Sequence, residues 1–236
     1  MVLHQTRIMG TGGLRIHMEL TFTPIDQNQW ERGQTFYYFS KMAPTGYSLT
    51  VDIDVTNMLQ HLKAANLKFF PAYLWLATKC LNEQQEFRIV QKDGIPGYYS
   101  FLTPLYATFH EDSKTFSMMW TTYDDDFMTF YESHLQNQKC FGQQRGFLSQ
   151  CPQQPPENAY TISCIPWISF NHFAVHSYGS SSYYFPSLEA GKFFVQGERT
   201  RMPLSITCHH AATDGYHVAK FLETFQHHVN TFLPLP

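Results

Sequence analysis

The sequence PLSITCHHAATDGYH, residues 203–217, places two adjacent histidines between an apolar run and a carboxylate. The apolar and β-branched residues at 204–208 predict a strand, and Asp214 followed by glycine is typical of the start of an amphipathic helix. Imidazole and carboxylate therefore meet at a strand-to-helix turn, which can hold a side chain rigidly. Because the ordinary histidine pKa of about 6.5 permits proton exchange at neutral pH, this turn is where a general base is expected.

The region around this turn resembles the acyl-transfer motif of the chloramphenicol acetyltransferase family, the trimeric type related to the acyltransferase domains of 2-oxo-acid dehydrogenases. The double histidine, the Asp-Gly pair and the aromatic-His-Val triplet of that motif match residues 209–218, and His210 stands at the family's catalytic position. Two further segments are similar. Residues 163–170 match the family's Ser-x-x-Pro-Trp-x-x-Phe, and residues 196–205 match the hairpin that leads into the catalytic strand. The resemblance spans residues 22–235.

The resemblance implies direct acetyl transfer from acetyl-coenzyme A to the 3-hydroxyl of chloramphenicol, which inactivates the antibiotic. His210 would remove the proton of the acceptor hydroxyl, and general-base catalysis of this kind is typically worth about 10²–10⁴-fold. The hydroxyl of Ser163 would hydrogen-bond the oxyanion of the tetrahedral intermediate, and losing one such donor commonly costs about 2.7–4 kcal/mol. Taken alone, a serine at a strand end is usually a turn residue. A ternary complex is implied, with acetyl-coenzyme A as co-substrate and no permanently bound cofactor.

An arginine near the N-terminus is expected to support the catalytic turn. The segment Trp30-Glu31-Arg32 matches the family's Trp-x-Arg, and taken alone Arg32 would be a surface cation. The resemblance implies that Arg32 forms a structural ion pair with Asp214, while the histidine is oriented by its own backbone carbonyl. Breaking a buried pair typically costs about 3–5 kcal/mol, so removing either partner should damage fold and activity together.

The resemblance also assigns residues to the two substrates, and here the match is less complete. Glu189 places a carboxylate where the family has a hydroxyl, and Phe39 lacks the phenol oxygen of the family's tyrosine. Both changes alter the acceptor side of the site rather than its catalytic groups. The acceptor pocket is expected at Tyr38, Phe39, Thr45, Tyr47, Phe173 and Glu189. Coenzyme A is expected to contact Trp167 and Phe193.

Composition bounds the remaining possibilities. A chain of 236 residues with 43% hydrophobic and 17% aromatic residues can build a substantial core. The net charge of −3, without a basic cluster, does not predict nucleic-acid binding. No stretch approaches the roughly 20 apolar residues that a membrane span needs.

The cysteines and histidines do not predict a metal site. The five cysteines are dispersed, without a CxxC pair or zinc-ligand spacing, which suits reduced thiols and a cytoplasmic protein. The twelve histidines include no HExxH pattern. The acidic triplet at 124–126 is interpreted as charge compensation at a helix start rather than as a metal ligand set.

Residues 1–17 contain three glycines and two arginines but no apolar signal-peptide core, so they are interpreted as a leader or tag-like extension. Residues 18–236 show no linker-like composition and are expected to form a single acetyltransferase catalytic domain.

Hydrophobic periodicity predicts mixed strands and helices. Thr56 is expected to cap a helix that runs to residue 65, and residues 140–158 are expected to form a long irregular loop. Further helices are predicted at 71–83, at 124–138 and after Asp214, and strands at 47–54, 87–90, 97–102, 105–110, 115–121, 160–164, 167–173, 193–196 and 204–208. This pattern indicates an α/β (α+β) two-layer sandwich with a mixed sheet, in agreement with the coenzyme A-dependent acyltransferase fold that the resemblance implies.

Three other functions stay open at this stage. The chain could be an O-acetyltransferase of the same fold with a different hydroxylated acceptor, or a non-catalytic coenzyme A-binding homologue. A metal-dependent hydrolase is a more remote possibility. The resemblance further implies a homotrimer with its active sites between subunits, for which the sequence carries no signal of its own.

Overall fold

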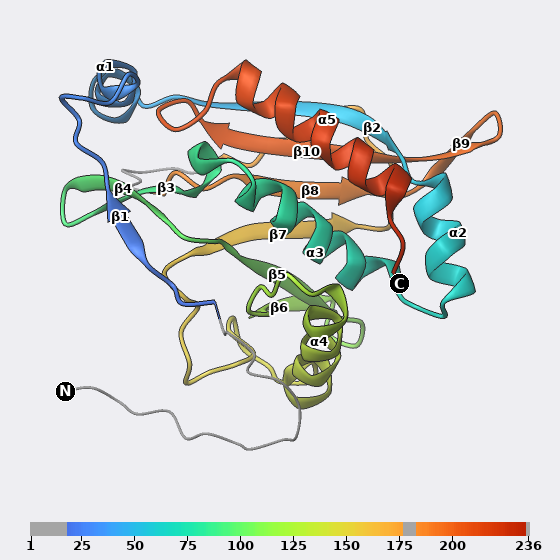
Figure 1. The fold of residues 1–236 in the computed structure, drawn as a ribbon. Helices are drawn as coiled ribbons and strands as arrows, with labels where there is room; N and C mark the ends of the chain where they lie inside the picture. Colours follow the sequence, from blue (N-terminus) through green and yellow to red (C-terminus); the bar gives the residue numbers. More distant parts are fainter. Residues whose placement is uncertain (1–17, 177–182, 235–236) are drawn as a thin grey trace.

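A computed structural model describes residues 18–176 and 183–234, and its helices cover one face of a large mixed sheet (Figure 1). The predicted leader, residues 1–17, lies outside the described residues. The sheet has the strand order β2-β10-β8-β7-β5-β6, with β9 paired to β10. Its strands are β2 (Gly46–Asp54), β5 (Thr103–His110), β6 (Thr115–Trp120), β7 (Ala159–Ile165), β8 (Ser187–Gly191), β9 (Phe194–Gln196) and β10 (Arg199–His209).

Strand direction divides this sheet. The β7 strand runs parallel to both β5 and β8, whereas the other pairs are antiparallel. Mixed pairing of this kind confirms the predicted two-layer α/β class. The β5–β6 hairpin also confirms the two strands predicted on either side of residues 111–114.

The helical layer packs on the face of the sheet that carries the hydrophobic core. Its helices are α2 (Thr56–Ala64), α3 (Phe69–Asn82), α4 (Phe127–Phe141) and α5 (Gly215–Thr231). Figure 1 shows α3 and α5 crossing the sheet side by side. Core residues of α3 and α5, such as Leu74 and Phe225, are almost completely buried together with the alternate strand residues Leu188, Leu204 and Ile206. Since side chains alternate along a strand, the residues between these point to the opposite face.

That opposite face is lined by small polar side chains on neighbouring strands. Strand register aligns these side chains in two rows across β2, β10 and β8. One row consists of Thr50, Ser205 and Glu189, and the next of Ser48, Thr207 and Ser187. We call this side of the sheet the open face, because the helices lie on the other. The segment 168–176 crosses part of it, where the N–H of Phe173 donates to Thr50 Oγ1 at 3.4 Å and its carbonyl accepts from Ser205 Oγ at 2.6 Å.

A smaller sheet and a short helical segment complete the described fold. The order of the smaller sheet is β1-β4-β3, and the segment preceding β2 forms α1 followed by a π-helical turn. These elements are β1 (Phe22–Pro24), α1 (Gly33–Tyr37), the π-helical turn (Tyr38–Met42), the 3₁₀ turn (Gln85–Arg88), β3 (Ile89–Lys92) and β4 (Ile95–Tyr99). Sequence patterns did not predict β1, α1 or the π-helical turn.

Two local predictions are wrong, one strand was not predicted, and the predicted cap in the acidic triplet is confirmed. Thr56 is the first residue of α2 rather than its cap, because its hydroxyl and N–H both donate to Asp54 Oδ1. Residues 167–173 form no strand, since their backbone crosses the open face instead of pairing with a neighbour. The β8 strand, Ser187–Gly191, was not predicted at all, although it lies between β7 and β10. Asp126, within the predicted acidic triplet, caps α4 by accepting from the N–H of Thr129 at 2.8 Å.

Candidate active site

The predicted catalytic turn connects the end of β10 to the start of α5. The N–H groups of Ala212 and Thr213 donate to the carbonyl of His209, at 3.0 and 3.2 Å, and close a tight turn. The N–H of His210 donates to the carbonyl of Thr45, just before β2, at 2.8 Å. These bonds fix the backbone of His210 against the end of the β2–β10 pair.

The half-buried imidazole of His210 is held in one orientation. Its Nδ1 lies 3.1 Å from the carbonyl oxygen of Thr213, which can only accept, so Nδ1 carries the proton of the neutral ring. The ring stacks on Phe39, with centroids 4.1 Å apart and planes 15° apart, and meets Tyr47 edge-on at 5.2 Å. Nε2 therefore keeps the free lone pair that a general base needs.

The source of this orientation differs from the expectation. The resemblance implied that the carbonyl of His210 itself would hold the ring, but the carbonyl of Thr213 takes that position. The carbonyl of His210 instead accepts a hydrogen bond from Nη2 of Arg32 at 3.4 Å.

Arg32 and Asp214 form the expected ion pair. Nη1 of Arg32 donates to Oδ2 of Asp214 at 2.6 Å, across a sequence separation of 182 residues. The side chains are 17% and 36% exposed, so water partly screens the pair and its contribution falls below the cost quoted for fully buried pairs. With its other nitrogen on the His210 carbonyl, Arg32 ties the N-terminal segment to both ends of the catalytic turn.

Asp214 has a second structural role that the sequence did not indicate. Its Oδ1 accepts from the N–H of Tyr216 at 3.1 Å, and its own N–H donates to Nδ1 of His217 at 3.2 Å, which forms a capping box at the start of α5. Partial burial alone would raise the pKa of Asp214. The hydrogen bond from Arg32 and the neighbouring His217 outweigh that effect and hold its pKa below the usual value. The carboxylate thus stabilises the conformation of the turn through its ion pair and its hydrogen bond to the helix start.

His209, the other half of the double histidine, has its ring held by contacts within the fold. Its Nδ1 accepts from the N–H of Ala211 at 3.1 Å, and its ring meets Tyr184 edge-on at 4.8 Å. Burial, together with the neighbouring His210, lowers its pKa. These contacts favour a neutral, structural histidine at this position.

Ser163, the predicted oxyanion donor, lies on β7 and points to the open face. Its neighbours Ile162 and Cys164 pack toward the core under the helices, so alternation turns Ser163 the other way. Register pairs Ser163 with Glu189 on β8, and Glu189 with Ser205 on β10. His210, by contrast, contacts Tyr47, which packs against the core on the helical side of the sheet.

The two predicted catalytic side chains are therefore far apart within one chain. Strand register places Ser163 at the same level of the sheet as Ser205 of β10. Along β10, Ser205 lies five residues before His210, which is a distance of roughly 16 Å. Across the sheet, β7 lies two strands from β10, which is a distance of roughly 10 Å. The combined separation is roughly 19 Å. Hydrogen bonds to one reacting acyl group need distances near 3 Å, so one chain does not bring this base and this donor to the same substrate.

Glu189 lies on the open face between these two strands and is only 4% exposed. Ser187 Oγ donates to its Oε1, whereas its Oε2 is buried without a hydrogen-bond partner among the described residues. Burial raises the pKa of Glu189 to about 7, and the Ser187 hydrogen bond only partly opposes that shift. In the described part of the chain, no lysine, arginine or histidine forms an ion pair with this carboxyl.

A cavity of about 1010 Å³ lies against the open face, and we call it the sheet-face cavity. Thr45 and Tyr47, both predicted acceptor-pocket residues, line it close to the catalytic turn. The floor is formed by Ser48, Thr161, Ser187 and Thr207. Glu189 lies behind Ser187, and Phe173 belongs to the segment that crosses the same face.

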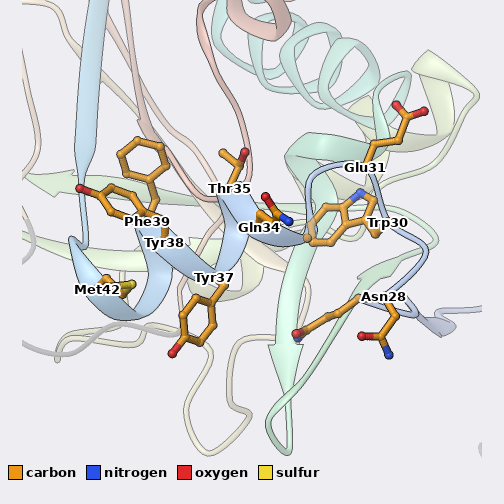
Figure 2. A pocket seen from close by; sticks show the side chains of 11 residues that line it. Asn28, Trp30, Glu31, Gln34, Thr35, Tyr37, Tyr38, Phe39 and Met42 are labelled. Atoms are coloured by element: carbon orange, nitrogen blue, oxygen red, sulfur yellow. The ribbon is translucent and has the colours of Figure 1, made fainter.

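Tyr38 and Phe39 line a different depression. Figure 2 shows this groove beside α1, of about 800 Å³, with Tyr38 and Phe39 toward one end and Trp30 toward the other. Phe39 lines this groove and also stacks on His210, which itself does not line the groove. Four of the six predicted acceptor residues thus line two separate hollows, Tyr38 and Phe39 the groove and Thr45 and Tyr47 the sheet-face cavity, whereas Phe173 and Glu189 line neither.

The two residues predicted to contact coenzyme A have different surroundings. Trp167 is 62% exposed and its ring meets Phe109 edge-on at 4.8 Å. Phe193 is partly buried and meets Phe69 edge-on at 4.9 Å. An exposed aromatic ring is free to stack on a ligand, whereas the Phe193 ring already contributes to the packing of α3.

In residues 18–176 and 183–234, no group of three or more histidine, cysteine, aspartate or glutamate side chains is arranged to hold a metal ion. Within the same ranges, no helix combines the length and the apolar character of a bilayer span.

Comparison with known proteins extends these observations. The family model described as chloramphenicol acetyltransferase matches residues 20–226. A chloramphenicol acetyltransferase of Clostridium butyricum is 35% identical over 208 residues, which are 88% of this chain and 94% of that protein. A solved chloramphenicol acetyltransferase superposes with a TM-score of 0.75 at 24% identity, over 88% of this chain and 99% of that one. The dihydrolipoamide acetyltransferase of Azotobacter vinelandii gives a TM-score of 0.58 at 17% identity, over 84% and 86%. The last two likenesses concern the fold alone.

Proposed function

Because the chain belongs to the chloramphenicol acetyltransferase family, we propose that it transfers the acetyl group of acetyl-coenzyme A to the 3-hydroxyl of chloramphenicol. The observation that carries this proposal is the geometry of His210. Its Nδ1 proton is held by the carbonyl of Thr213, so that Nε2 remains free to accept a proton. Acetylation of the hydroxyl inactivates the antibiotic.

The proposed reaction needs no covalent enzyme intermediate. Nε2 of His210 takes the proton of the 3-hydroxyl while its oxygen forms a bond to the thioester carbonyl carbon. The carbonyl oxygen becomes an oxyanion, which accepts a hydrogen bond from the Ser163 hydroxyl. When the intermediate collapses, the carbon–sulfur bond breaks and the departing thiolate takes the proton back from His210. The products are the acetyl ester and free coenzyme A.

We further propose a homotrimer in which each site combines His210 of one copy with Ser163 of the next. The separation of roughly 19 Å between these residues in one chain supports sharing, because one chain does not complete the site. Large apolar side chains on the surface support a contact between copies. These are Phe109, Phe116, Phe147, Trp167 and Ile168, between 40% and 70% exposed.

Three smaller proposals accompany this function. We treat residues 18–236 as one catalytic domain, and acetyl-coenzyme A as a co-substrate that would contact Trp167 and Phe193. We place the enzyme in the cytoplasm, which the unpaired state of its cysteines supports.

A second candidate function is acetylation of a different hydroxylated acceptor. The observation that favours it is the buried carboxyl of Glu189 with its unpartnered oxygen, which brings a charge and a hydrogen-bonding group to the open face. A screen of hydroxylated acceptors at fixed acetyl-coenzyme A would distinguish the two candidates.

The decisive experiment measures thiol release from acetyl-coenzyme A with chloramphenicol as acceptor. The wild type should turn over, and His210→Ala should lose about 10²–10⁴-fold in kcat. His227→Ala, an exposed histidine of α5, is the matched control and should keep wild-type activity. A folded wild type that releases no thiol would overturn the proposal for chloramphenicol. Release that is unaffected by His210→Ala would overturn the assignment of His210 as the base.

A further inference from the structure

Thr213, whose carbonyl oxygen holds the Nδ1 proton of His210, is itself held by a side chain of another element. Thr213 is 2% exposed, and its Oγ1 accepts a hydrogen bond from the phenol of Tyr47 at 3.2 Å. Tyr47 belongs to β2, and the two partners are 166 residues apart in the sequence. This hydrogen bond therefore connects the middle of the catalytic turn to a strand that is distant in sequence.

The same tyrosine also touches His210 directly. Its ring meets the imidazole edge-on, with centroids 5.2 Å apart. Its hydroxyl reaches Thr213, three residues further along the turn. Tyr47 therefore contacts both the proposed base and the residue that orients this base.

The hydrogen bonds around the Thr213 hydroxyl have a defined direction. Burial raises the pKa of Tyr47 far above its usual value, so the phenol keeps its single proton and donates it to Thr213. Cys208 pairs with Tyr47 across β2 and β10 and is 3% exposed. Burial raises the pKa of the Cys208 thiol to about 12, against the opposing effect of its hydrogen bonds with Thr213 and Tyr47. The three polar side chains thus satisfy one another.

The peptide unit between Thr213 and Asp214 is held at both of its polar groups. Its carbonyl accepts from Nδ1 of His210 at 3.1 Å, and its N–H donates to Nδ1 of His217 at 3.2 Å. A peptide unit is planar, so a rotation that breaks one of these hydrogen bonds also disturbs the other. The hydrogen bond from Tyr47 anchors the side chain on the adjoining Cα atom and so limits this rotation.

We infer that Tyr47 is a positioning residue for the general base, because its hydroxyl acts through Thr213 to keep the proton of neutral His210 on Nδ1. This inference rests on the proposed function. The position of the proton in a neutral imidazole is set by the hydrogen bond that the other nitrogen leaves available or makes. A displaced Thr213 carbonyl lets the proton move to Nε2, and a ring protonated there cannot take the proton of the acceptor hydroxyl. This role is separate from the acceptor contact that the family resemblance implies for Tyr47.

The first measurement is the tautomer of His210 in the full chain. It is read from ¹⁵N chemical shifts of histidine-labelled protein at pH 8, where an ordinary histidine is neutral, and His210→Ala identifies the resonances by their loss. The wild type should carry the proton on Nδ1. Tyr47→Phe keeps the ring and removes the hydroxyl, and should lower the ratio of the Nδ1 to the Nε2 form by about two- to tenfold.

The second measurement separates kcat from KM in the thiol-release assay. Tyr47→Phe should lower kcat by about two- to tenfold and leave KM for chloramphenicol unchanged, because the base is misplaced while the acceptor still binds. Thr213→Val removes the accepting hydroxyl and should match Tyr47→Phe. Since both changes break one hydrogen bond, the double variant should lose no more than either single variant. Thr213→Ser keeps the hydroxyl and should exceed Thr213→Val in kcat by about the same factor.

Tyr106→Phe is the matched control. The hydroxyl of Tyr106 shares a hydrogen bond of 2.7 Å with Oγ1 of Thr121, and its strand β5 lies three positions from β10 in the sheet. The control removes the same kind of tyrosine–threonine hydrogen bond from a buried position. It should lower the stability of the fold without changing the tautomer of His210 or kcat.

The outcomes separate this inference from the proposed function. Thiol release by the wild type, with the tautomer and kcat of Tyr47→Phe and Thr213→Val unchanged, would overturn the inference and leave the function intact. A tautomer shift in Tyr47→Phe, without thiol release by the wild type, would support the positioning role and overturn the function. A loss confined to KM would make Tyr47 an acceptor contact and overturn the positioning role. Wild-type His210 with its proton on Nε2 would overturn both.

Discussion

Co-expression of two inactive variants should restore activity if the active site lies between copies of the chain. His210→Ala removes the base, and Ser163→Ala removes the oxyanion donor. Each variant alone should be defective, by about 10²–10⁴-fold for the base and about 10²–10³-fold for the donor. Because His210 and Ser163 are separated by roughly 19 Å in one chain, the missing group in one copy can be supplied by its neighbour.

The expected recovery follows from the random combination of the two variants within one ring. In a closed ring built at random from equal amounts of the two variants, a site is intact when its histidine comes from a Ser163→Ala copy and its serine from a His210→Ala copy. Each condition holds for about half of the copies, so about one quarter of the sites are intact. The recovered rate should therefore be about one quarter of the wild-type rate per site, far above either variant alone.

The assay compares co-expressed variants with separately purified variants mixed after folding, using thiol release as readout. The co-expressed sample should recover, because its copies assemble into mixed rings as they fold, and the mixture made after folding measures any exchange of copies between finished rings. A co-expressed sample whose chains have assembled together, shown by separate affinity tags, and which has no more activity than the two variants alone would refute the reasoning. In that case His210 and Ser163 would have to act within one chain, and the separation deduced from strand register would not describe the active enzyme.

Two further predictions concern Asp214, which stabilises the catalytic turn, and Phe39, whose ring stacks on His210. Asp214→Asn keeps an N-cap residue but loses the ion pair with Arg32, and should lower the free energy of unfolding by about 1–2 kcal/mol. Asp214→Ala loses both the cap and the ion pair, and should lower it by about 2–3 kcal/mol. Urea unfolding measures both values. Folding lowers the pKa of Asp214, so its contribution to the free energy of unfolding is present above the unfolded pKa of about 3.9 and is lost as pH falls through the folded pKa. The difference in stability between wild type and Asp214→Asn should therefore shrink in acid. A difference that grew in acid would contradict the ion pair with Arg32 as its source. Phe39→Ala removes the ring stacked on His210 and should lower kcat by about tenfold, with the free energy of unfolding little changed. Tyr37→Ala, which removes an exposed ring nearby, serves as the control. Equal kcat values for the two variants would show that the stack does not position His210.

Much of the catalytic turn was predictable because its signals are local. An apolar strand, two histidines and an Asp-Gly helix start follow one another within a few residues, and the structure has β10 ending at His209 and α5 beginning at Gly215. The pairing of Arg32 with Asp214 is not local and came from the family resemblance. The capping role of His217 and the carbonyl of Thr213 on the His210 ring depend on backbone geometry, which no residue pattern at this turn specifies.

The central strand β8 shows why part of the site was missed. Its sequence, SLEAG, consists mostly of residues that are depleted in strands, and its only large apolar side chain is Leu188. Pairing with β7 on one side and β10 on the other satisfies its backbone and overrides that weak propensity. Ser187 and Glu189 make the segment a poor strand by composition. Ser187 lines the sheet-face cavity, and its hydroxyl donates to the buried carboxyl of Glu189 behind it.

The arrangement of the sheet also explains why the proposed catalytic residues could be named from the family motifs, whereas their relative positions in the fold could not. A motif fixes the base near the end of one strand, and another motif fixes the donor in a strand two positions away, but neither records which face of the sheet each side chain meets. Alternation sends Ser163 to the open face, and contact with Tyr47 keeps His210 on the helical side. If His210 and Ser163 act together as proposed, their site is completed by a second copy of the chain, and activity should depend on association as well as on folding.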